Sequence, residues 1–151
     1  MMNFAQQEFY VAGGTLSPDA PSYIQRSADE ELYDHIKKGD YCYILTPRQM
    51  GKSSLVARTA KRLQDEGVRT SYIDLTGIGG QKEKQSAEAW YMGIANCLNR
   101  DLGLAINLKE WWAERNYLGP LQVLMEFVED GVLKKTAGPV VIFIDEIDST
   151  I

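Results

Sequence analysis

The stretch Thr46-Pro47-Arg48-Gln49-Met50-Gly51-Lys52-Ser53-Ser54 decides how the rest of the sequence is interpreted. It matches the phosphate-binding loop pattern G-x-x-x-x-G-K-[ST] except at the first position, where Thr46 replaces glycine. In such a loop, backbone N–H groups surround a phosphate chain and lead into a helix N-terminus, where partial positive charge favours anions. We therefore predict a nucleotide site formed by Pro47, Arg48, Gln49, Met50, Gly51, Lys52, Ser53 and Ser54.

Three residues at the end of this loop have separate expected roles. Gly51 lets the backbone approach the phosphates because it has no Cβ. Lys52 is expected to reach the β- and γ-phosphate oxygens as a point charge, which makes it a candidate catalytic residue. The Ser53 hydroxyl is expected to be a ligand of Mg²⁺. The alternative is a chance Gly-Lys-Ser at an ordinary helix start, and the strand expected before it and the helix expected after it argue against that alternative.

A second motif, Val140-Val141-Ile142-Phe143-Ile144-Asp145-Glu146, is an apolar run that ends in two carboxylates. The run predicts a buried strand. An acid at the carboxyl end of such a strand lies where open α/β sheets bind ligands. Asp145 is thus expected to hold Mg²⁺, and Glu146 to orient and deprotonate the attacking water. The alternative is a buried strand that ends in a solvated acidic turn.

Expected strands and helices alternate along the chain. Two of the strands are apolar throughout, which is typical of parallel strands covered on both faces. The sequence therefore predicts an α/β fold with a three-layer parallel sheet and helices on both faces. An irregular lead-in is expected over 1–26, and the N-terminal portion of a domain that contains the phosphate-binding loop is expected over 27–151. Strands are expected at 41–45, 70–75 and 139–144, helices at 52–66 and 86–101, and shorter helices from Ser27, Asn107 and Pro120.

Charge and composition exclude several classes of partner. The 151 residues include 16 Lys and Arg against 21 Asp and Glu, a formal charge of −5. This acidic balance argues against bulk electrostatic binding to nucleic acid or to an anionic membrane. The sequence has no basic n-region followed by an apolar core at its N-terminus, and no apolar run approaches the ~20 residues of a membrane span. We expect a cytoplasmic protein.

Residues 9–15 and 23–32, together with the two motifs, are similar to the corresponding parts of a known protein family. The sequence resembles the bacterial AAA-like domain of the STAND class of P-loop NTPases, within the ASCE group. The resemblance implies a nucleotide switch that binds ATP and Mg²⁺ and is part of a larger signal-transduction ATPase. It also implies that the segment before the first strand lies against adenine, through Tyr23, Ile24 and Arg26. The alternative for these three residues is ordinary capping and packing of the helix that follows.

The resemblance further predicts a strand that comes later in the sequence than the acidic strand and lies between it and the loop strand. The chain stops six residues after Asp145, so we expect the N-terminal portion of a domain, with unpaired strand edges. Two functions stay open. One is an ATP-binding switch with slow hydrolysis, partnered by a C-terminal domain or other chains. The other is a non-hydrolysing domain that acts only by docking to another chain. A nucleic-acid motor ranks below both because the chain is acidic.

Overall fold

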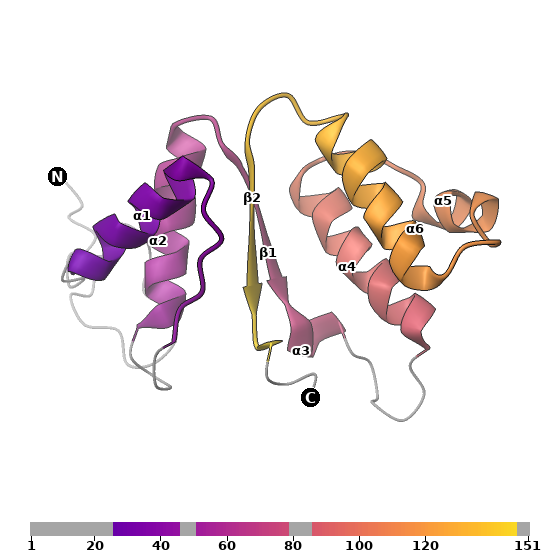
Figure 1. Ribbon diagram of the computed structural model, residues 1–151, viewed down its shortest axis with the longest axis horizontal. Helices are drawn as coiled ribbons and strands as arrows, with labels where there is room; N and C mark the ends of the chain where they lie inside the picture. Colours follow the sequence, from indigo (N-terminus) through magenta and orange to yellow (C-terminus); the bar gives the residue numbers. More distant parts are fainter. Residues whose placement is uncertain (1–25, 46–50, 79–85, 148–151) are drawn as a thin grey trace, which may run out of the picture. The chain divides into compact units, whose positions relative to one another are not determined.

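The computed structural model describes residues 26–45, 51–78 and 86–147, which belong to two compact units (Figure 1). Unit 1 extends to Glu66 and contains the helices α1 (Ser27–Lys38) and α2 (Lys52–Asp65). Unit 2 begins at Gly67 and combines a small parallel sheet with helices. The elements of unit 2 are β1 (Arg69–Asp74), α3 (Leu75–Ile78), α4 (Ala87–Asp101), α5 (Leu108–Glu114), α6 (Pro120–Glu126), the π-helix η1 (Phe127–Leu133) and β2 (Val140–Asp145).

Contacts between Tyr33 of α1 and the C-terminal end of α2 hold the two helices of unit 1 together. The guanidinium of Arg62 lies 3.5 Å from the centre of the Tyr33 ring, a cation–π contact. The Tyr33 hydroxyl donates a hydrogen bond to Glu66, which also pairs with Lys37 at 2.7 Å. Leu63, on α2, is fully buried. The start of α1 at Ser27 and the helix expected over 52–66 are both confirmed.

The prediction of a strand at 41–45 is wrong. These residues have no strand conformation, and the side chains of Tyr41, Tyr43 and Leu45 are 89%, 72% and 84% exposed. A strand is stable only when a neighbouring strand satisfies its N–H and C=O groups. Among the described residues of unit 1, no strand is present to supply those partners. Apolar composition alone therefore did not determine the conformation of this segment.

The sheet of unit 2 consists of β1 and β2, which pair in parallel. The register places Arg69 opposite Val140 and Asp74 opposite Asp145, so both strands end in an acid at the same edge of the sheet. The helices from α3 to η1 connect the two strands, and α4 packs against β1. The expected strands at 70–75 and 139–144 are confirmed to within one residue at each end, and so is their parallel arrangement.

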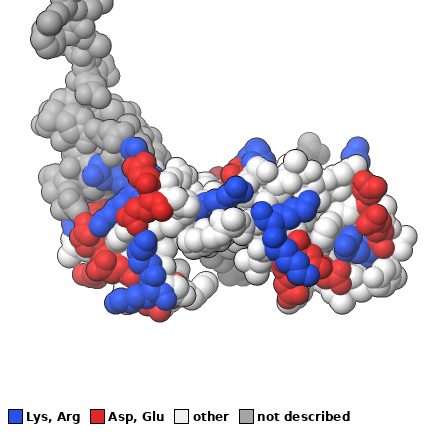
Figure 2. Space-filling view, turned by 90° about the horizontal axis from the view of Figure 1, so that it is seen from above, with Lys and Arg blue, Asp and Glu red and all other residues white. Residues whose placement is uncertain are grey.

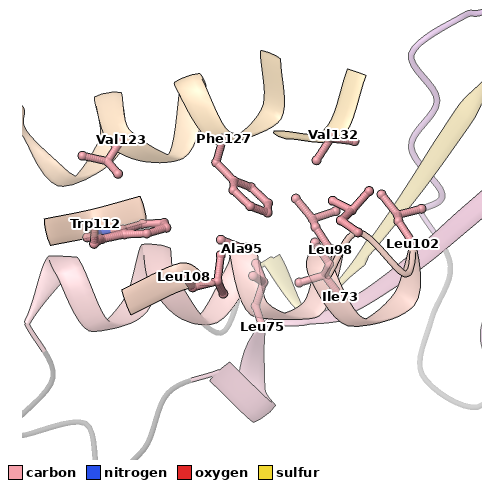
Figure 3. Packing of buried hydrophobic residues seen from close by; sticks show 11 residues of the cluster. Ile73, Leu75, Ala95, Leu98, Leu102, Leu108, Trp112, Val123, Phe127 and Val132 are labelled. Atoms are coloured by element: carbon pink, nitrogen blue, oxygen red, sulfur yellow. The ribbon is translucent and has the colours of Figure 1, made fainter. Parts of the chain in front are cut away.

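An apolar core holds the helices of unit 2 against its sheet (Figure 3). Phe127 is fully buried, and its ring points toward α4, near Ala95 (Figure 3). Burying a side chain of this size contributes roughly 1.5–3 kcal/mol through the hydrophobic effect. The buried cluster comprises Ile73, Leu75, Ala95, Leu98, Leu102, Leu104, Leu108, Trp112, Val123, Phe127 and Val132.

The starts of three helices in unit 2 follow from local chemistry. The Ser86 hydroxyl accepts the N–H of Ala89 at 3.1 Å, and the Asn107 side chain accepts that of Glu110 at 3.4 Å, so both residues are N-caps. Pro120 occupies the first position of α6, where its missing N–H costs no hydrogen bond. Among the described residues, no helix has the length and apolar character needed to cross a membrane.

Candidate functional site

The N-terminus of α2 carries the described part of the phosphate-loop motif. Gly51 is the N-cap of this helix and has a φ of 80°, in the left-handed region that favours glycine. Its carbonyl accepts the N–H of Leu55 at 2.9 Å, which begins the helical ladder. Because glycine has no side chain, it cannot cap the first N–H groups of α2 as serine or aspartate would. These groups and the helix dipole make the start of α2 suited to a phosphate.

The side chains that follow Gly51 differ in burial. Those of Lys52 and Ser53 are half-buried, whereas that of Ser54 is buried. The first turn of α2 holds no acidic residue, so no carboxylate there opposes an approaching phosphate. Lys52 and Ser53 are therefore accessible on a helix end with a favourable charge environment.

Arg26 lies beside the glycine of the motif. Its Nη2 atom is 3.7 Å from the point that a Cβ on Gly51 would occupy. Arg26 is also the N-cap of α1, and its backbone N–H donates to the Asp29 carboxylate at 2.5 Å. The capping interaction that was the alternative for this residue is therefore present, and its guanidinium reaches the start of α2 as well.

Asp145 ends β2, and its carboxylate has a hydrogen-bond donor on each oxygen. The Tyr72 hydroxyl donates to Oδ2 at 2.6 Å, and the backbone N–H of Glu146 donates to Oδ1 at 2.9 Å. A carboxylate oxygen has about two acceptor positions, so a carboxylate that accepts a hydrogen bond can in general also be a metal ligand. Burial raises the pKa of Tyr72, and the hydrogen bond to Asp145 raises it further, so this phenol stays a donor at neutral pH.

Glu146 has a φ of 56°, which is uncommon for a residue with a side chain. Such a conformation costs of order 1–3 kcal/mol and persists only where the surroundings hold it in place. The hydrogen bond from its own N–H to Asp145 is one such restraint. The backbone therefore turns sharply at the residue expected to act on water.

The other acid at this sheet edge has a local structural role. Asp74 Oδ1 accepts the backbone N–H of Thr76 at 2.9 Å and the hydroxyl of Thr76 at 2.6 Å. These two bonds close the turn between β1 and α3. Asp74 is therefore not included among the candidate site residues, although it is the register partner of Asp145.

The predicted site residues fall into three groups. Arg26, Gly51, Lys52, Ser53 and Ser54 belong to unit 1, where the structure brings Arg26 and Gly51 together. Asp145 and Glu146 belong to unit 2. The remaining predicted residues lie outside the described part of the chain: Tyr23, Ile24, Pro47, Arg48, Gln49 and Met50.

Ser53 in unit 1 and Asp145 in unit 2 each carry an oxygen ligand of the kind that Mg²⁺ prefers. A serine hydroxyl and an aspartate carboxylate are hard oxygen ligands, and Mg²⁺ in nucleotide sites takes only one or two protein ligands besides phosphate and water. In the part of the chain that the structure describes, no three His, Cys, Asp or Glu side chains gather into a metal centre. A metal held mainly by protein side chains is thus not indicated there.

Tyr72 is a contact of the site that sequence reasoning missed. Its position in the middle of an expected strand gave no signal, because only the pairing of β1 with β2 brings it next to Asp145. Once the neighbouring strand is known, a tyrosine two residues before a strand end can be expected to lie near the residue that ends that neighbour.

Comparison with known proteins identifies the family. The profile of the AAA-like domain family matches residues 11–151. The chain belongs to the AAA-like domain family. An uncharacterized WD repeat-containing protein of Synechocystis sp. is 44% identical to this AAA-like domain over 154 residues, covering 99% of the chain and 13% of the relative. No solved structure matches it significantly.

Proposed function

We propose that this AAA-like domain binds ATP together with Mg²⁺ and hydrolyses it slowly, as a nucleotide switch. The observation that carries the proposal is the left-handed Gly51 directly before Lys52, at the start of the 14-residue helix α2. This arrangement offers backbone N–H groups, a helix dipole and an ammonium group to a phosphate chain. Membership of the AAA-like family is consistent with a nucleotide-binding module.

Each candidate residue has a role in this proposal. Lys52 pairs with the β- and γ-phosphate oxygens, and Ser53 and Asp145 are the protein ligands of the metal. Mg²⁺, when bound, neutralises charge on the transferred phosphoryl group. Glu146 orients the attacking water and takes its proton. Positioning and charge stabilisation of this kind are most of what phosphoryl transfer requires from a protein.

The proposal extends to the nucleotide base and to the larger protein. Arg26, beside Gly51, lines the adenine with Tyr23 and Ile24. In the larger protein, helices cover both faces of the parallel sheet and complete a three-layer fold. That protein is a cytoplasmic ATPase of the STAND class, and its C-terminal domain or other chains are the partners of this domain. The relative supports the proposal that this domain is part of a larger protein, because the chain spans only 13% of that WD repeat-containing protein.

Nucleic acid is not included among the proposed ligands. On the face seen in Figure 2, Lys and Arg side chains lie among Asp and Glu side chains. The formal charge of the chain is −5. Nucleic-acid binding draws most of its affinity from phosphate neutralisation by clustered basic residues. The charge of the whole chain therefore favours a nucleotide bound by a few specific groups.

The test measures the affinity for ATP with Mg²⁺ by calorimetry, in the full wild-type chain and in Lys52→Ala. We expect Lys52→Ala to lose at least about tenfold in affinity, since a charge-assisted hydrogen bond contributes about 1.5–3 kcal/mol. Lys61→Ala is the matched control: it removes the same charge from the same helix, where Lys61 pairs only weakly, at 3.4 Å, with Asp65. Phosphate release is measured in parallel.

Undiminished ATP binding by Lys52→Ala would overturn the nucleotide site. Equal losses in Lys52→Ala and Lys61→Ala would also overturn it, because they would reveal a general charge effect. ATP binding with no phosphate release by the wild-type chain would favour the non-hydrolysing alternative over the slow ATPase.

A further inference from the structure

Tyr72 and Asp145 meet across the two strands of unit 2. The parallel register places Tyr72 opposite Phe143, two residues before Asp145 on β2. Residues two apart on a strand share a face, so Tyr72 and Asp145 lie on the same side of the sheet. The phenol spans the diagonal between the strands, and its hydroxyl donates to Asp145 Oδ2 at 2.6 Å.

The other end of Tyr72 is also held. Its backbone N–H donates to Asp101 Oδ2 at 3.2 Å, and the neighbouring Ser71 hydroxyl donates to the same oxygen at 2.8 Å. Ser71 and Ile73, on either side of Tyr72, are almost completely buried. A tyrosine side chain has only two torsions. A fixed backbone therefore leaves its hydroxyl little freedom.

The two donors on Asp145 act on different oxygens. Tyr72 donates to Oδ2, and the Glu146 backbone N–H donates to Oδ1. Together they fix the plane of the carboxylate, because rotation about its terminal bond would break both hydrogen bonds. A side-chain donor that orients a metal ligand in this way typically affects metal affinity 10- to 100-fold.

We propose that Tyr72 is a positioning residue that sets the orientation of the Asp145 carboxylate for the metal–nucleotide complex. The inference rests on the proposed function, since it needs Asp145 to be a metal ligand. Tyr72 itself touches neither the metal nor the nucleotide. It acts through Asp145, and its loss is expected to weaken metal binding while nucleotide binding without metal stays unchanged.

The experiment compares the full wild-type chain with Tyr72→Phe, which removes only the hydroxyl. Mn²⁺, a paramagnetic probe for the magnesium site, is titrated in the presence of ADP and followed by electron paramagnetic resonance. We expect Tyr72→Phe to lose about tenfold in Mn²⁺ affinity, and ADP affinity in EDTA to be unaltered. Tyr117→Phe is the matched control, because Tyr117 is an exposed tyrosine of the same unit.

A double-mutant cycle with Asp145→Asn shows whether Tyr72 acts through the carboxylate. In the Asp145→Asn background, Tyr72→Phe should have no further effect on Mn²⁺ affinity. In the metal-free wild-type chain, adding Mg²⁺ and ADP should shift the Tyr72 ¹³Cζ resonance and leave that of Tyr117 in place. This last measurement needs no variant, so it tests the inference even if a variant folds poorly.

The outcomes separate the two levels of the proposal. If the wild-type chain binds metal and ADP, and Tyr72→Phe binds Mn²⁺ with the same affinity, the positioning role alone is overturned. A further loss caused by Tyr72→Phe on top of Asp145→Asn would also overturn it, because Tyr72 would then act independently of the carboxylate. A wild-type chain that binds no nucleotide with metal would overturn the proposed function, and the role of Tyr72 with it.

Discussion

Asp101, at the C-terminal end of α4, accepts hydrogen bonds from three residues. Its partners are Ser71 and the backbone N–H of Tyr72 on β1, together with Arg100 at 2.8 Å. The carboxylate side chain is 19% exposed. Burial by itself raises the pKa of Asp101, but the hydrogen bonds from Arg100, Ser71 and Tyr72 outweigh that effect and lower it below its ordinary value. Asp101 therefore stabilises the contact between α4 and β1 in its charged form.

We predict that Asp101→Asn destabilises unit 2 by about 1–2 kcal/mol at neutral pH, because hydrogen bonds to a charged acceptor are lost. A lowered folded-state pKa contributes stability that is present above the unfolded pKa, about 3.9 for Asp, and is lost as pH falls through the folded value. The difference between variant and wild type should accordingly shrink below about pH 4. Urea unfolding across this pH range is the measurement.

Asp130→Asn is the control for this prediction. Asp130 pairs with Lys134 at 2.5 Å on the exposed surface of the same unit, where an ion pair contributes at most about 1 kcal/mol. A loss in Asp101→Asn that equals the loss in Asp130→Asn, or that does not change with pH, would contradict the anchoring role of Asp101.

Sequence reasoning identified some of these residues and not others, for a physical reason. Gly51, Lys52, Asp145 and Glu146 belong to contiguous motifs whose spacing is set by the local backbone, so they could be found without a structure. Tyr72 depends on a contact between residues 73 positions apart. Nothing in the chain around it encodes that contact.

At the scale of elements, helix α4 contains a glycine for which local propensity gives the wrong expectation. Glycine in a helix interior costs about 1 kcal/mol relative to alanine, so Gly93→Ala would ordinarily stabilise the protein. A Cβ on Gly93, however, would lie 2.6 Å from Cγ2 of Ile78 in α3. This methyl group belongs to a β-branched side chain, whose first torsion has little freedom. Close approach of α3 to α4 therefore explains the glycine.

We predict that Gly93→Ala destabilises the protein by about 1–2 kcal/mol, because the added methyl overpacks the α3–α4 contact. Combined with Ile78→Ala, which removes the clashing atom at a cost of its own, Gly93→Ala should destabilise the chain less than it does alone. Gly77→Ala is the control, because a Cβ at Gly77 would meet no atom within 4 Å. Thermal unfolding of the wild type, the three single variants and the double variant is the measurement, and additive losses in the double variant would refute the proposed clash.

The helical segment after Pro120 shows where periodicity misleads at this scale. A regular helix predicts that residues four apart share a buried face, as Val123 and Phe127 do. Beyond Phe127 the chain continues as the π-helix η1, in which both Gly131, four residues on, and Val132, five residues on, are buried. The wider turn thus adds a position five residues on to the buried face. Composition does not indicate such a change of helix type.

At the scale of the whole molecule, the alternation of strands and helices correctly predicted a mixed α/β protein with parallel pairing. The same reasoning failed at Tyr41–Leu45, which is apolar but not a strand. The difference lies in non-local partners: β1 and β2 hydrogen-bond to each other, whereas the described part of unit 1 has helices but no strand. Hydrogen bonding between strands is a property of the assembled fold rather than of one segment.

A ligand that binds only the folded chain raises its stability by mass action, and this gives a prediction for the whole molecule. At a ligand concentration of about 100 times Kd, the gain is about 2.7 kcal/mol. We expect ATP with Mg²⁺ to raise the thermal midpoint of the wild-type chain, and EDTA to remove the metal-dependent part of that rise. Differential scanning fluorimetry over a series of ATP concentrations is the measurement.

Two variants show which groups produce this stabilisation. Lys52→Ala should lose the ATP-dependent rise at all metal concentrations, because the ammonium group pairs with the phosphates themselves. Asp145→Asn should lose only the part that EDTA removes, because its carboxylate acts on the metal. A rise that persists in Lys52→Ala, or that ATP produces equally with and without Mg²⁺, would mean that the stabilising ligand binds elsewhere on the chain.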